Sequence, residues 1–131
     1  MSAESMTNLD RLCAQSGWEI ARQVQDALGK GAENLITKSL GVLQEDGVYA
    51  FFLYQASRKR EKDGADKVGE QSAKLLSEND LLPKGTTSVQ QALEKIRDGQ
   101  LADNLDQLLL AKRLLEQTLI YARYHAKALE E

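Results

Sequence analysis

Apolar residues recur every three or four positions along most of this 131-residue chain, which is the periodicity of amphipathic helices. The pattern predicts six helices. The first begins near Thr7 or Asn8 and ends before Gly29, and the others cover about 34–45, 48–60, 66–78, 88–99 and 101–129. Nine glycines and a single proline fall mostly between these segments, where they end helices. β-Branched and aromatic residues are sparse, so the prediction is an all-α fold with a long C-terminal helix.

The length of the chain is typical of one domain, and we expect a single helical bundle over residues 1–131. Within it, residues 1–7 are predicted to be disordered, and 61–66 and 79–87 to be exposed loops. The segment 48–60 is apolar nearly all round, which is typical of a buried central helix. The predicted core contains Tyr49, Phe51, Phe52, Leu53, Leu115 and Leu119.

Composition limits the cellular setting. Cys13 is the single cysteine, which excludes an internal disulfide and favours a reducing compartment. The first ten residues are polar and do not resemble a secretory signal, and no apolar run approaches the roughly 20 residues of a membrane span. We therefore expect a soluble cytoplasmic protein without membrane contact. The net charge of −3 predicts that any nucleic-acid contact depends on a local patch or on partners.

The residues that could support catalysis are few. His125 is the only histidine, so a histidine metal cluster is excluded, and a Cys13–His125 nucleophile pair is a weak alternative to a buried thiol and a solvated imidazole. Acidic pairs with helical spacing, Glu94 with Asp98 and Asp103 with Asp106, could belong to a magnesium-dependent hydrolase but also fit a solvated helix face. The sequence therefore predicts no enzyme, no metal, no cofactor and no small-molecule substrate.

Two groups of residues could bind RNA. The first is the basic segment Arg58, Lys59, Arg60 and Lys62, which follows the apolar helix, although cations there also complement a helix C-terminus. The second is Trp18, the only tryptophan, which lies opposite the apolar stripe of the first helix together with Arg11 and Arg22. Such a tryptophan suits stacking on a base, burial against another subunit, or cover by another helix of the same domain.

The final helix is apolar on two sides. One face contains Leu105, Leu108, Leu115, Leu119, Ala122 and Ala126, and nearly opposite lie Leu110, Leu114 and Tyr121. A helix of this kind is either sandwiched inside a bundle or presents its outer face to another subunit. Leu110, Leu114, Tyr121 and Trp18 are therefore the candidate subunit contacts.

Three stretches carry a resemblance to a known family. Residues 9–22 open with a Leu-Asp-Arg-x-x-Ala pattern, residues 35–53 read LITKSLGVLQEDGVYAFFL, and residues 108–129 read LLLAKRLLEQTLIYARYHAKAL. In this order they resemble the small helical subunit, the fifth Cmr protein, of type III-B CRISPR effector complexes. The chain departs from the pattern in its longer, more charged segment 61–87 and in Tyr121, where a tryptophan is expected.

The resemblance implies a non-catalytic building block of an antiviral defence complex. Copies would stack as a minor filament along the backbone that bears the crRNA and would help to hold the guide–target RNA. The implied partners are other subunits of the complex, copies of itself, crRNA and target RNA. The small subunit of type III-A complexes is one alternative, and a helical protein–protein adaptor without an RNA role is another.

Overall fold

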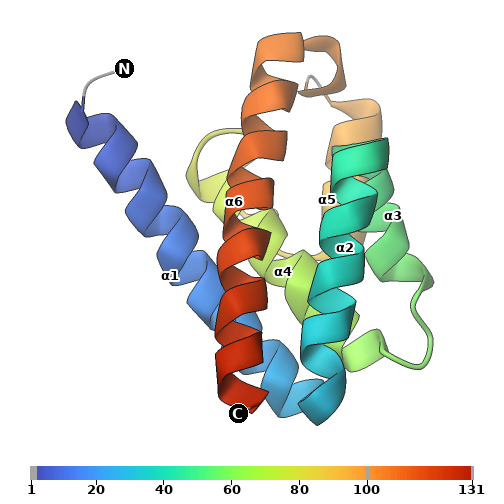
Figure 1. Ribbon diagram of the computed structural model, residues 1–131. Coiled ribbons are helices and arrows are strands. Elements are labelled where there is room, and N and C mark those ends of the chain that lie inside the picture. Colours follow the sequence, from blue (N-terminus) through green and yellow to red (C-terminus); the bar gives the residue numbers. More distant parts are fainter. Residues whose placement is uncertain (1–2, 100, 131) are drawn as a thin grey trace.

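A computed structural model describes residues 3–99 and 101–130 of the chain. Within these residues the structure contains six α-helices, two short 3₁₀ segments and no β-strand (Figure 1). The helices are α1 (Ala3–Leu28), α2 (Ala32–Asp46), α3 (Val48–Ser57), α4 (Lys62–Glu78), α5 (Val89–Asp98) and α6 (Leu105–Glu130), with 3₁₀ segments at Gly29–Gly31 and Leu101–Asp103. The prediction of an all-α bundle of about six helices with a long C-terminal helix is confirmed.

Local signals set several of these boundaries. Gly47 ends α2 with a φ of 95°, a left-handed conformation that glycine adopts without strain, and its N–H donates to the Leu43 carbonyl at 3.0 Å. The Gly47 carbonyl then accepts from Phe51 N at 3.0 Å in the first turn of α3. Ser88 caps α5, because its hydroxyl oxygen accepts from Gln91 N at 3.1 Å.

The helix α6 runs through the bundle between α1 and α2 (Figure 1). The packing of α1 on α6 is the most extensive between any two elements, and α1 also packs against α4. Gly17 lies at the α1–α6 crossing, where a Cβ atom would stand 2.8 Å from the Thr118 carbonyl oxygen and 2.8 Å from Tyr121 Cβ. The absence of a side chain at Gly17 therefore allows the close approach of the two helices.

All six helices contribute buried apolar side chains to the core. Phe51 and Phe52 are fully buried and pack edge to face, with ring centroids 5.0 Å apart, and Leu115 and Leu119 are also fully buried. Two of the residues predicted to lie in the core are not fully buried. Tyr49 is only partly buried, and Leu53 is 46% exposed. The expected burial of Leu53 is wrong because α2, α4 and α5 cover one side of α3 and leave its outer side in solvent.

Three predicted segment boundaries also need correction. The first helix begins at Ala3 rather than near Thr7 or Asn8, and residues 1–2 of the segment predicted to be disordered lie outside the described part of the chain. The helix α3 ends at Ser57 rather than at residue 60, because Arg58 adopts an extended conformation. The final helix starts at Leu105, after a 3₁₀ turn at Leu101–Asp103.

The predicted exposed loops are only partly correct. Residues 62–66 form the first turn of α4, where Gly64 is buried and leaves no space for a Cβ, which would lie 2.4 Å from Leu28 Cδ1. Residues 79–87 contain no helix, but Leu81, Leu82 and Thr86 are buried, so this loop folds back onto the bundle. Contacts with other parts of the bundle therefore explain why a glycine stands within α4 and why the loop 79–87 contains apolar side chains.

Candidate nucleic-acid and subunit interfaces

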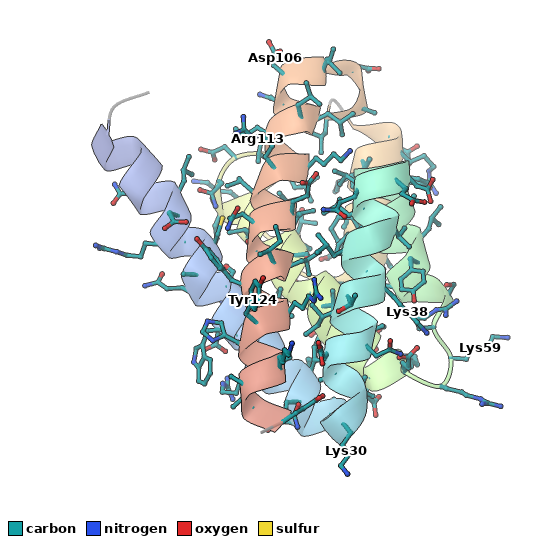
Figure 2. The ribbon with its side chains drawn as sticks, in the orientation of Figure 1. Lys30, Lys38, Lys59, Asp106, Arg113 and Tyr124 are labelled. Carbon is teal, nitrogen blue, oxygen red and sulfur yellow. The ribbon has the colours of Figure 1, made fainter. Side chains whose placement is uncertain are left out.

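The predicted basic segment forms the connection between α3 and α4. The Arg58 guanidinium stacks over the Tyr54 ring, with Cζ 4.4 Å from the ring centroid. Lys59 and Arg60 are exposed, and Lys59 points away from the bundle (Figure 2). Lys62 instead binds Asp66 at 2.8 Å, and this hydrogen-bonded ion pair raises the pKa of Lys62. Three of the four predicted cations thus remain without a carboxylate partner among the described residues.

A hollow of about 430 Å³ lies beside this segment. Its lining includes Arg58, Lys59 and Lys62 but also the carboxylates of Asp66 and Glu70. The two carboxylates offset much of the positive charge inside the hollow, so the exposed Lys59 and Arg60 at the loop provide the stronger attraction for a phosphate backbone.

The second predicted RNA surface consists of Trp18, Arg11 and Arg22, and only two of these three side chains are free to contact a ligand. Trp18 is 42% exposed, and its indole meets the His125 ring edge to face at a centroid distance of 5.3 Å. Arg22 is held by Glu19 at 2.7 Å and by Asp26 at 3.7 Å, and the Arg22 hydrogen bond lowers the pKa of the Glu19 carboxyl. Arg11 is exposed and takes part in no ion pair among the described residues. Trp18 and Arg11 therefore remain available, whereas Arg22 is largely neutralised.

The predicted subunit face on the last helix is mostly covered by α1. Leu114 is only 5% exposed, and its carbonyl accepts from the Cys13 thiol at 3.6 Å. Tyr121 is partly buried, and its hydroxyl donates to the Asp10 carboxylate, which raises the pKa of Tyr121. Leu110 alone of the three is exposed, at 38%. The assignment of Leu114 to an outer surface is therefore wrong: α6 is sandwiched at this level because α1 packs along it.

An apolar surface does exist on α6, but nearer its start. Leu105 and Leu109, at 67% and 50% exposure, join Leu110 in the first two turns. Leu105 shares a predicted helical face with the buried Leu115 and Leu119, but it lies in the first turn of α6 and is exposed. Leu9, Leu110 and Leu114 also line a largely apolar hollow of about 450 Å³ between α1 and α6. Sequence periodicity did not indicate Leu105 or Leu109 as a surface.

The residues considered for catalysis do not converge. Burial raises the pKa of the Cys13 thiol, which disfavours the reactive thiolate. Cys13 contacts Leu114, and His125 lies eleven residues further along α6, about 16 Å at the rise of a helix. Asp98 pairs with Arg97 at 2.8 Å, which lowers the pKa of Asp98. Among the described residues no three histidine, cysteine or acidic side chains gather in a group that could hold a metal ion.

No described helix is long and apolar enough to cross a membrane. The arrangement as a whole is that of a small all-α domain with one basic loop, one exposed tryptophan and an exposed cluster of leucines.

The fold is similar to that of a solved protein from a CRISPR system. The crystal structure of a CRISPR-associated Cmr5 family protein from Thermus thermophilus matches 93% of this chain and 97% of its own length, with a TM-score of 0.65 and 21% sequence identity. The resemblance indicated by the three sequence stretches is thus confirmed at the level of the fold. No model of a protein family and no curated protein sequence matches this chain.

Proposed function

We propose that this protein is a non-catalytic small subunit of a type III-B (Cmr) CRISPR effector complex that acts in the cytoplasm. The observation that supports this most directly is the similarity of its fold to a Cmr5 family protein over nearly the whole of both chains. In this role the protein needs surfaces for neighbouring subunits and RNA, and it needs no reaction centre of its own.

Exposed residues in two parts of the molecule support the proposal of these two kinds of partner. A stacking contact between copies is heterologous, because one surface of a subunit meets a different surface of the next. The exposed cluster of Leu105, Leu109 and Leu110 suits one side of such a contact. Lys59 and Arg60, on the loop between α3 and α4, suit a phosphate backbone held within the assembled particle.

The proposed function predicts which molecules purify with the tagged protein. We expect a set of Cmr proteins and a short crRNA to accompany it from its native host, as identified by mass spectrometry and RNA sequencing. Recovery with type III-A proteins would replace the type III-B assignment. Recovery of a protein partner without RNA would favour the adaptor function and contradict the proposal.

The basic loop predicts a charge effect in the assembled particle. Replacing Arg58 and Arg60 with Glu should weaken retention of target RNA and reduce the salt dependence of its binding, because phosphate contacts are lost. Neither side chain is part of the core, so the complex should still form. Filter binding at several salt concentrations measures both quantities. Unchanged affinity and unchanged salt dependence in an intact mutant particle would contradict the role of this loop.

A further inference from the structure

The exposed aromatic residues gather near the C-terminal end of α6. Tyr124 is 63% exposed and lies on the outward side of this helix (Figure 2), and Trp18 is 42% exposed. Trp18 packs against His125, the residue that follows Tyr124, so the two aromatic side chains belong to the same level of the α1–α6 pair. The contact with the edge of His125 supports the indole while much of its surface stays in solvent.

Two cations accompany these aromatic residues. Lys127 lies three residues after Tyr124, about one turn along the same helix, and Arg123 lies one turn before Lys127. Both are exposed, and neither forms an ion pair with a carboxylate of the described residues. Arg22, which is near Trp18 in sequence, differs because it is engaged by Glu19 and Asp26. The charge available beside the aromatic residues therefore comes from α6.

The two ends of α6 differ in chemistry. Near its start the exposed apolar residues are the aliphatic Leu105, Leu109 and Leu110, which suit burial against a protein. Near its end, apart from Leu129, they are the phenol of Tyr124 and the indole of Trp18, which comes from the neighbouring α1. Cations accompany both rings. Single-stranded nucleic acids are bound by this second combination, because bases stack on aromatic rings while cations attract the phosphates.

We infer that Trp18, Tyr124, Arg123 and Lys127 form a binding surface for unpaired RNA nucleotides. This inference rests on the proposed function and assigns part of its RNA contact to the α1–α6 pair, in addition to the loop between α3 and α4. It also assigns Trp18 to RNA rather than to a neighbouring copy. Unpaired nucleotides are specified because stacking requires base faces, which a duplex does not expose except at its ends.

The single tryptophan provides a direct readout. We expect a six-nucleotide oligouridylate to quench the fluorescence of Trp18 saturably at about 50 mM salt, and the quenching to weaken steeply as salt increases. A blunt RNA duplex of equal phosphate concentration should quench much less. The full-length free protein is suitable for this titration, and low salt compensates for its net negative charge of −3.

Matched variants locate the site. Tyr124→Ala should weaken binding about tenfold, whereas Tyr124→Phe, which keeps the ring, should bind like the parent protein. Lys127→Gln and Arg123→Gln should each weaken binding and reduce the salt slope by about 1. Lys38→Gln removes the same charge from an exposed position on α2, outside both RNA surfaces, and we expect it to leave the quenching of this short oligonucleotide unchanged.

Three results would overturn the inference. One is the absence of quenching by any single-stranded RNA at low salt. Another is loss of binding in Arg60→Gln with no effect of Tyr124→Ala or Lys127→Gln, which would place the RNA on the loop between α3 and α4. The third is a change of Trp18 fluorescence with protein concentration alone, which would make this surface a contact between copies. Each of them is compatible with recovery of Cmr proteins and crRNA, so failure here is distinguishable from failure of the proposed function.

Discussion

Replacing Leu114 with Glu should lower the free energy of unfolding by about 3–5 kcal/mol, because it places a carboxylate without a partner in a nearly dry contact between α1 and α6. Leu114 is 5% exposed and touches Cys13 across this interface. Since about 1 kcal/mol corresponds to roughly 4 °C in a domain of this size, thermal melting followed by circular dichroism should show a loss of more than about 10 °C or of the folded state.

The matched control for this substitution is Leu110→Glu, one turn earlier on the same helix. Leu110 is 38% exposed, so the new carboxylate can remain in water, and the melt should stay within a few degrees of the parent. A cooperative melt of Leu114→Glu close to that of the parent would show that α1 does not cover this part of α6. The candidate subunit surface would then again include Leu114.

The second large effect is expected in the core. Phe52→Ala should cost about 3–5 kcal/mol, because truncating a buried aromatic side chain leaves a cavity and removes its contacts. Phe52 is fully buried and packs edge to face on Phe51. Chemical denaturation gives the free energy of unfolding directly, provided that the slope of the transition is unchanged.

The neighbouring residue provides the comparison for Phe52. Leu53 follows Phe52 in α3 but is 46% exposed, so Leu53→Ala should cost less than about 1 kcal/mol. Equal losses for the two substitutions would mean that α3 is buried on all sides, as its apolar sequence alone predicts. A loss for Phe52→Ala below about 1 kcal/mol would show that α3 is not part of the core.

Leu114→Glu and Phe52→Ala should also affect function, because the helices that they disturb position the proposed RNA surfaces. The position of Trp18 and Tyr124 depends on the packing of α1 against α6, and the loop with Lys59 and Arg60 depends on where α3 ends. A variant that loosens either contact therefore changes the RNA surfaces as well as stability. For this reason the residues substituted in the tests of RNA binding lie outside the core.

Much of the secondary structure is determined by the sequence itself. Helical periodicity together with few β-branched residues predicts an all-α chain, because an amphipathic helix repeats its apolar face every three or four residues. Gly47 and Ser88 fix helix ends through local geometry: glycine allows the left-handed conformation, and the serine hydroxyl accepts from an N–H of the first turn. Such signals act within a few residues, so they can be interpreted before the fold is known.

Only the tertiary structure decided which apolar and charged faces are free. Periodicity shows that Leu53, Leu105 and Leu114 are apolar, but burial depends on which helix packs over them, and only Leu114 is covered. The contact of Trp18 with His125 joins residues more than a hundred positions apart in the chain. The physical reason is that these properties depend on the crossing of helices distant in sequence, which no local pattern encodes.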